Sequence, residues 1–168
     1  MTQATLLPDE LVAKAREVIE ANRTIGRKLA VAESCTGGLV CAALTEIPGS
    51  SEVLDAGYIT YSNEAKIADL HVSEEVVETF GAVSIATAWA MAQGALDSSN
   101  ADVAVAITGI AGPEGGSPSK PVGTVVFARA ERQPGPDDVT ADQKLFENEN
   151  RAGVRLQAAL CALDLLMP

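Results

Sequence analysis

Residues 32–38, with the sequence AESCTGG, place a hydroxyl and a thiol at the end of a short apolar run. We expect this run to be a strand followed by a helix, so Ser34 would lie where open α/β sheets bind ligands. N–H groups at the start of that helix, near Thr36, Gly37 and Gly38, could hold a phosphate or the oxyanion of a tetrahedral intermediate. Ser34 is therefore a candidate nucleophile. The alternative is that it only caps the helix.

A candidate base follows the second expected strand, in residues 61–66, YSNEAK. This segment brings Tyr61, Asn63 and Lys66 to the carboxyl end of that strand, where we expect Asn63 to cap the short helix that carries Lys66. A lysine can act as a general base where burial lowers its pKa from about 10.4, and Ser-Lys pairs are an established nucleophile–base arrangement. The other interpretation is a solvated lysine on a helix face.

A loop rich in glycine and proline, residues 108–116, follows the most apolar run of the chain. Gly109 and Gly112 permit close backbone approach, and successive N–H groups there could form an anion-binding nest. The spacing is not that of a P-loop, so ATP binding is not inferred. The alternative is a connecting loop at the edge of the sheet.

Arg151 and Arg155 stand four residues apart at the start of the last expected helix. Arginine is unfavourable at a helix N-terminus, which suggests a ligand role, because a guanidinium can bind a phosphate with two hydrogen bonds. Surface ion pairs with Glu147 or Glu149 are the alternative.

Histidine and cysteine offer little competing chemistry. His71 is the only histidine, so the usual zinc ligands are missing. Cys35 is a rival nucleophile, but no nearby histidine is apparent to activate it, and we interpret it as a small buried side chain. We expect neither a metal nor an organic cofactor.

The arrangement of elements predicts an α/β fold. Apolar runs predict strands at 28–33, 53–61, 101–107, 122–130 and 139–146, and the last two form a hairpin through a turn at 134–138. Helical spacing is found in the segments 8–22, 39–47, 63–70, 84–96 and 151–166, with another helical turn opening at Ser73. We expect a three-layer α/β/α sandwich with a mixed, mainly parallel five-stranded sheet, forming one domain over residues 1–168.

Composition limits the partners. The net charge of −11, with no cluster of lysine and arginine, argues against nucleic acid. No run of about 18 apolar residues could span a membrane, and the N-terminus does not resemble a signal peptide. Three cysteines without a CxxC pair fit reduced thiols, so we expect a cytoplasmic protein.

Several blocks of the chain resemble the C-terminal domain family of the competence/damage-inducible protein CinA, whose stand-alone form is a nicotinamide-nucleotide amidohydrolase. The blocks are AESCTGG (32–38), PGSS (48–51), GYITYSNEAK (57–66), FGAVS (80–84), ITGIAGPEGGSPSKPVGTV (107–125) and RAGVR (151–155).

This resemblance implies that Ser34 is the nucleophile and Lys66 its base, with Tyr61, Thr108 and Arg151 at the site. The family usually carries Gly-Asp before this arginine, whereas Glu-Asn stands there in this chain.

The implied reaction is hydrolysis of nicotinamide mononucleotide to nicotinate mononucleotide and ammonia, without a cofactor, by a homo-oligomer. Two alternatives stay open. The same fold could serve as a non-catalytic regulatory module that binds a nucleotide or phosphate, or as an amidase for another carboxamide.

Overall fold

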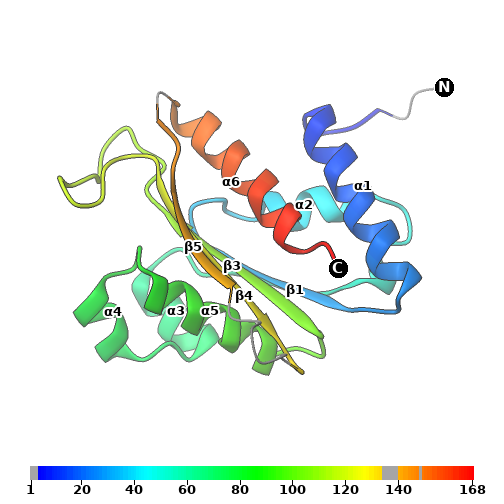
Figure 1. Ribbon diagram of the computed structural model, residues 1–168, viewed down its shortest axis with the longest axis horizontal. Coiled ribbons are helices and arrows are strands. Elements are labelled where there is room, and N and C mark those ends of the chain that lie inside the picture. The colour runs from blue at the N-terminus through cyan, green and yellow to red at the C-terminus, as the bar shows by residue number, and fades with distance from the viewer. Residues whose placement is uncertain (1–3, 134–139, 148) are drawn as a thin grey trace.

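A five-stranded sheet forms the centre of the computed structural model, which describes residues 4–133, 140–147 and 149–168 (Figure 1). The strand order is β2-β1-β3-β4-β5, so the sheet is open, with β2 and β5 at its edges. The strands are β1 (Leu29–Glu33), β2 (Leu54–Ile59), β3 (Val103–Gly109), β4 (Thr124–Glu131) and β5 (Thr140–Leu145).

Strand directions confirm a mixed, mainly parallel sheet that ends in a hairpin. β1 pairs in parallel with β2 and β3, whereas β4 is antiparallel to both β3 and β5. Only β4 therefore runs against the other strands. The turn expected at 134–138 lies outside the described residues.

Helices cover both faces of the sheet and confirm the three layers (Figure 1). One face carries α1 (Asp9–Thr24), α2 (Leu39–Thr45) and α6 (Arg151–Leu165). The other carries α3 (Asn63–Leu70), α4 (Glu74–Phe80) and α5 (Ile85–Asp97), and a short 3₁₀ turn, η1 (Ser50–Glu52), precedes β2. Across the described part of the chain, every helix is too short or too polar to cross a bilayer.

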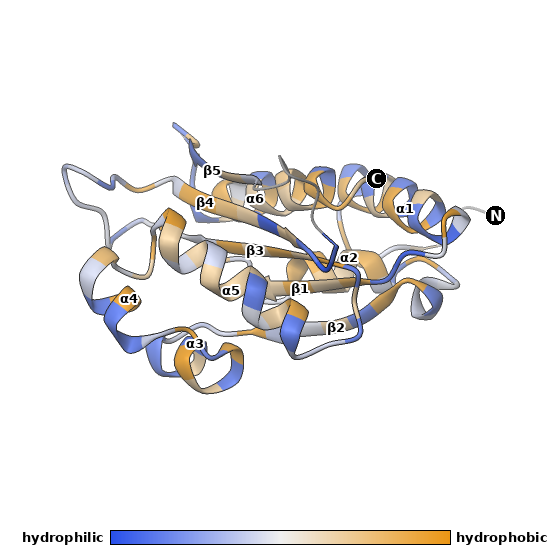
Figure 2. Ribbon diagram, turned by 60° about the horizontal axis from the view of Figure 1, so that its bottom comes forward, coloured by the Kyte–Doolittle hydropathy of each residue, from blue (hydrophilic) through white to orange (hydrophobic). Residues whose placement is uncertain are grey.

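The central strands β1 and β3 are buried on both faces, as their apolar sequences predicted (Figure 2). Val31 and Val105 face α1, α2 and α6, whereas Ala32 and Ala106 face α5. The alanine face leaves room for α5 to lie close to the sheet, since a helix approaches most closely over small side chains. A Cβ at Gly94 of α5 would overlap the carbonyl oxygen of Leu70, so that contact requires glycine.

The start of α3 differs from the sequence prediction. Asn63 was the expected cap, but Ser62 is the capping residue, and its hydroxyl accepts a hydrogen bond from the Ala65 N–H at 3.0 Å. A capping residue needs an extended backbone. Ser62 has φ −85° and ψ 163°, whereas Asn63 is already the first helical residue.

The parallel strands place their carboxyl ends at one edge of the sheet. In register, Glu33 of β1 stands between Ile59 of β2 and Ile107 of β3. Ser34 after β1, Thr60 after β2 and Thr108 near the end of β3 therefore gather at this edge.

Candidate active site

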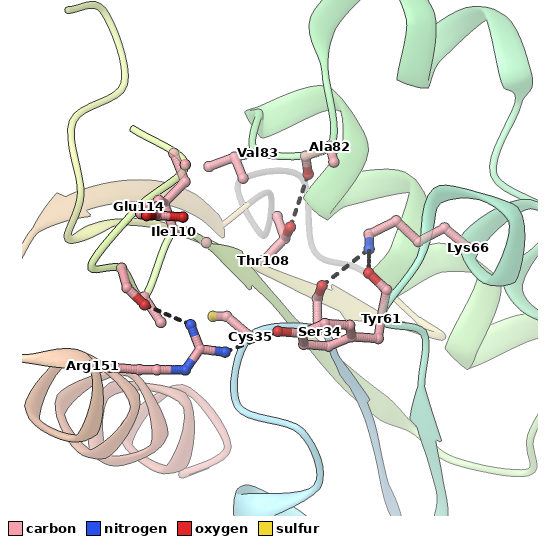
Figure 3. Close-up of a pocket in the computed structure, with 14 residues that line it drawn as sticks. Ser34, Cys35, Tyr61, Lys66, Ala82, Val83, Thr108, Ile110, Glu114 and Arg151 are labelled. Atoms are coloured by element: carbon pink, nitrogen blue, oxygen red, sulfur yellow. Dashed lines mark hydrogen bonds between the residues drawn. The ribbon is translucent and has the colours of Figure 1, made fainter. Parts of the chain in front are cut away.

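Ser34 and Lys66 meet at the carboxyl edge of the sheet, as the sequence predicted (Figure 3). Ser34 directly follows β1, and Lys66 reaches it from α3. The Lys66 Nζ lies 3.0 Å from the Ser34 Oγ. Both side chains are buried, with relative exposures of 7% for Ser34 and 1% for Lys66. The alternative of a solvated lysine is therefore wrong. The serine that only caps a helix is wrong as well, because Gly38, and not Ser34, occupies the N-cap position of α2.

Burial favours the uncharged form of the Lys66 amine. Its Nζ also donates hydrogen bonds to the carbonyl oxygens of Thr60, at 2.8 Å, and Tyr61, at 3.3 Å. Burial lowers the pKa of Lys66 from its ordinary value of 10.5, an effect that Cys35 only partly opposes. A neutral amine has two N–H groups and one lone pair. If the two N–H groups donate to the carbonyls, the lone pair faces the Ser34 hydroxyl, as general-base catalysis requires.

The helix that follows Ser34 does not offer free N–H groups in its first turn, contrary to expectation. The Glu33 carboxylate accepts hydrogen bonds from the Val40 N–H at 3.0 Å and the Cys41 N–H at 3.1 Å. The Gly37 N–H donates to the Ser34 carbonyl oxygen at 3.0 Å. Within the described residues, the N–H groups of Cys35, Thr36 and Gly38 have no backbone or side-chain acceptor in another residue. Cys35 and Thr36 directly follow Ser34, so their amides are the candidate donors for an oxyanion.

Arg155 fixes the orientation of this turn instead of binding a ligand or forming a surface ion pair. Its Nε donates to the Cys35 carbonyl oxygen at 3.1 Å, and its Nη2 donates to the Thr36 carbonyl oxygen at 3.2 Å. In a planar trans peptide the N–H and C=O groups point in opposite directions. The Thr36 N–H therefore points away from Arg155.

Arg151 reaches the site despite the altered residues before it. Its Nη1 donates to the Gly112 carbonyl oxygen at 2.6 Å, and its Nη2 donates to the Tyr61 hydroxyl at 3.0 Å. Asn150 caps α6 by accepting the Gly153 N–H at 2.8 Å, so the helix still begins at Arg151. Against the described part of the chain, three of its five guanidinium N–H groups have no acceptor and could hold an anion.

A cavity of about 290 Å³ connects these groups. Thr108 lies in its wall, and the Thr108 hydroxyl donates to the Ala82 carbonyl oxygen at 2.8 Å, which joins the end of β3 to the segment before α5 (Figure 3). The sequence-predicted residues that line the cavity are Ser34, Tyr61, Lys66, Thr108, Gly109, Gly112 and Arg151.

Four predicted binding residues lie outside the cavity wall: Thr36, Gly37, Gly38 and Asn63. Asn63 is exposed, because it belongs to the solvent-facing first turn of α3. Thr36 is fully buried, and Gly37 lies against the Arg155 guanidinium, since the turn faces α6 here. Of these residues, Thr36 and Gly38 keep a backbone N–H without an acceptor among the described residues.

Sequence reasoning missed part of the cavity wall and the role of Glu33, the residue before Ser34. Ala82, Val83, Ile110, Ala111, Glu114 and Gly115 also line the cavity. The FGAVS block had marked residues 80–84 without assigning them a role. Glu33 carried a signal of its own, because a carboxylate that ends an apolar strand must find N–H partners when it is buried.

Cys35 is not activated as a nucleophile. Burial raises the pKa of its thiol to about 11, so the thiol stays protonated near neutral pH. Within residues 4–133, 140–147 and 149–168, no three His, Cys, Asp or Glu side chains are grouped to hold a metal ion.

The fold and site together define an α/β protein with a buried serine–lysine pair at the carboxyl edge of a mixed sheet. The family model described as "CinA C-terminal domain" matches residues 12–168. This chain therefore belongs to the CinA C-terminal domain family.

Individual relatives agree with this assignment. The chain is 48% identical over 148 residues to "Nicotinamide-nucleotide amidohydrolase PncC" of Enterobacter agglomerans, covering 88% of each chain. It is 51% identical over 146 residues to a "Putative competence-damage inducible protein" of Symbiobacterium thermophilum, covering 84% of this chain. That match spans only 34% of the relative, and this chain likewise spans about a third of several other curated relatives.

The fold is also that of a solved structure. The crystal structure of competence/damage inducible protein CihA from Agrobacterium tumefaciens is 45% identical in sequence and superposes with a TM-score of 0.92. The match covers 97% of each chain.

Proposed function

We propose that this protein is a nicotinamide-nucleotide amidohydrolase that converts nicotinamide mononucleotide to nicotinate mononucleotide and ammonia. The observation that carries the proposal is the 3.0 Å contact between the Lys66 Nζ and the Ser34 Oγ. Within the described residues, the other hydrogen bonds of this lysine go to carbonyl oxygens. The similarity to a protein named for this activity, over 88% of both chains, supports the choice of substrate.

The first half of the proposed reaction forms an ester. Neutral Lys66 takes the Ser34 proton while the Ser34 Oγ attacks the carboxamide carbon. The electron pair of the C=O bond moves to oxygen, where the Cys35 and Thr36 N–H groups hold the negative charge. Removal of one such donor typically costs about 10²–10³ in turnover. Lys66 then protonates the amide nitrogen, the C–N bond breaks, and ammonia leaves an acyl group on Ser34.

The second half releases the acid. Water enters where ammonia left and gives a proton to Lys66 as its oxygen attacks the ester carbon. When the tetrahedral intermediate collapses, the Lys66 proton returns to the Ser34 Oγ. The product acid gives its remaining proton to solvent water and leaves as the carboxylate, and the enzyme regains its starting state. Each step uses the same amine, first as base and then as acid.

The nucleotide phosphate binds at the opposite side of the cavity in this proposal. Arg151 has three free N–H donors, and the Ala111 and Gly112 N–H groups have no protein acceptor in the described residues. Arginine and backbone amides together form a site suited to a phosphate. These local donors override the repulsive net charge of −11.

A substrate panel tests this proposal. Ammonia release is measured from nicotinamide, nicotinamide riboside and nicotinamide mononucleotide without added metal. We expect the mononucleotide to have the highest kcat/KM, because only it carries the phosphate. Equal values for riboside and mononucleotide would indicate another amidase specificity. Binding of the mononucleotide without ammonia release would favour the non-catalytic regulatory module.

We also infer a cytoplasmic location and a homo-oligomeric state. All three cysteines are unpaired, which fits a reducing compartment. The homo-oligomer rests on the family resemblance, and sedimentation of the purified chain measures it directly.

A further inference from the structure

We propose that Glu33 is a positioning residue that holds the Ser34 nucleophile in place, an inference that rests on the proposed function. Glu33 is the last residue of β1 and immediately precedes Ser34. Its side chain is fully buried, with a relative exposure of 0%. A buried carboxylate is costly unless its oxygens are hydrogen-bonded, so the partners of Glu33 show what its burial achieves.

Both oxygens of Glu33 are used at the start of α2. Oε1 accepts from the Val40 N–H at 3.0 Å, and Oε2 accepts from the Cys41 N–H at 3.1 Å. The capping position itself is occupied by Gly38, which has φ 98° and no side chain to make these bonds. A capping side chain normally accepts from these second and third N–H groups of a helix. Glu33 accepts these same two hydrogen bonds, although it lies five residues before Gly38.

Because Glu33 makes the capping bonds of α2, the Ser34 turn is closed into a ring. The backbone of Glu33 is fixed in β1 at one end of the turn, and its carboxylate is fixed to α2 at the other. The turn between them, residues 34–38, cannot shift without breaking one of these attachments. Arg155 adds a third attachment through the carbonyl oxygens of Cys35 and Thr36.

The backbone of Glu33 also connects to the base. Its carbonyl oxygen accepts from the Thr60 N–H at 2.9 Å. The Thr60 carbonyl oxygen in turn accepts from the Lys66 Nζ at 2.8 Å. Glu33 is therefore adjacent to the nucleophile and two hydrogen bonds from the base. Its carboxylate makes no hydrogen bond to Lys66, so it acts on the pair through geometry.

The test compares Glu33→Gln with Glu33→Asp and a matched control, Glu46→Gln. An amide at position 33 accepts through one oxygen and turns an NH₂ group toward the second helix N–H, which displaces the turn. Aspartate keeps both acceptors on a shorter side chain. Glu46 lies at the other end of α2, where its carboxylate accepts the Leu6 N–H at 2.9 Å, away from Ser34.

The primary measurement is the rate at which phenylmethanesulfonyl fluoride modifies Ser34, followed by protein mass. In this reaction the Ser34 oxygen displaces fluoride from sulfur and its proton leaves through Lys66, so no nucleotide is needed. We expect Glu33→Gln to slow modification by about 10²-fold, the usual effect of displacing a reacting atom by about 1 Å. Glu33→Asp should fall between Glu33→Gln and wild type, and Glu46→Gln should stay within about twofold of wild type.

Turnover of nicotinamide mononucleotide provides the second readout. Glu33→Gln should lower kcat with little change in KM, and the pH midpoint set by Lys66 should not move. A folded Glu33→Gln protein that is modified at the wild-type rate overturns the inference. Failure of both Glu33 variants to fold also overturns it, because the residue would then be needed for folding alone.

If the proposed function is wrong, the same experiments give a different set of results. If wild-type Ser34 is modified but the mononucleotide is not hydrolysed, the substrate is wrong, while the comparison of Glu33 variants still decides the positioning role. If wild-type Ser34 is not modified, no reactive serine exists to be positioned, and both proposals fall.

Discussion

The Arg151 guanidinium donates a hydrogen bond to the Tyr61 hydroxyl at 3.0 Å, although 90 residues separate the two in sequence. A second hydrogen bond ties the same guanidinium to the Gly112 carbonyl oxygen. Arg151 thus connects the segment after β2 with the loop after β3, on the side of the cavity where we place the phosphate. Its position depends on both partners.

Tyr61→Phe removes one of these partners and keeps the aromatic ring. A hydrogen bond typically contributes about 0.5–1.5 kcal/mol, so we expect KM for nicotinamide mononucleotide to rise by roughly 2- to 13-fold. The riboside has no phosphate, and its kcat/KM should change less. Steady-state kinetics with both substrates measures this, and an equal loss for both would contradict a role through Arg151.

Arg151→Ala removes the phosphate contact itself. Hydrogen bonds to charged groups are worth about 1.5–3 kcal/mol, which predicts a 10-fold to 150-fold loss in kcat/KM for the mononucleotide. The exposed Arg16→Ala variant on α1 is a matched control for the loss of one positive charge. An equal loss in the two variants would show that Arg151 acts only through the net charge.

The pH profile reports on Lys66. Because burial lowers its pKa below the ordinary 10.5, the uncharged base should become available at a lower pH than for a solvated lysine. We expect kcat/KM to rise with pH and to level off above a midpoint clearly below 10.5. A rate that rises only near the ordinary lysine pKa would contradict the buried neutral base.

The same lowered pKa predicts that Lys66 destabilises the fold. The unfolded chain binds a proton on Lys66 more tightly than the folded protein does, so the free energy of unfolding should rise with pH between the folded and unfolded pKa values. Lys66→Met keeps the length of the side chain and removes the charge. We expect a higher Tm at pH 7 together with lost activity. A clearly lower Tm would contradict this, and differential scanning calorimetry distinguishes the two.

Gly94 provides a test of the fold apart from the site. Alanine normally favours a helix over glycine by about 1 kcal/mol, but a Cβ at Gly94 would overlap the Leu70 carbonyl oxygen. We therefore expect Gly94→Ala to destabilise the protein, by about 1–3 kcal/mol. Urea unfolding measures the change, and a stabilised variant would show that α3 and α5 are less closely packed.

The chemistry at the edge of the sheet was predictable because it follows from strand direction. Ser34 and Lys66 each come soon after a strand of the parallel part, and neighbouring parallel strands end at the same edge. The buried runs of β1 and β3 were equally clear, since their residues are almost all apolar. These features depend on local sequence and on one simple rule of topology.

What could not be predicted depends on side chains that meet only in the folded protein. Nothing near Glu33 in the sequence says that its carboxylate turns toward α2 and accepts the Val40 and Cys41 N–H groups. Arg155 and Arg151 look alike in sequence, yet one binds turn carbonyls and the other faces the cavity. The exposure of Asn63 likewise follows from how α3 lies against α5.

Ammonia release from nicotinamide mononucleotide by Ser34→Ala, compared with wild type, tests the central claim most directly. We predict steady release by the wild-type protein and loss of turnover in a variant that remains folded, because the ester to Ser34 can no longer form. Undiminished release by the folded Ser34→Ala protein would show that Ser34 is not the nucleophile.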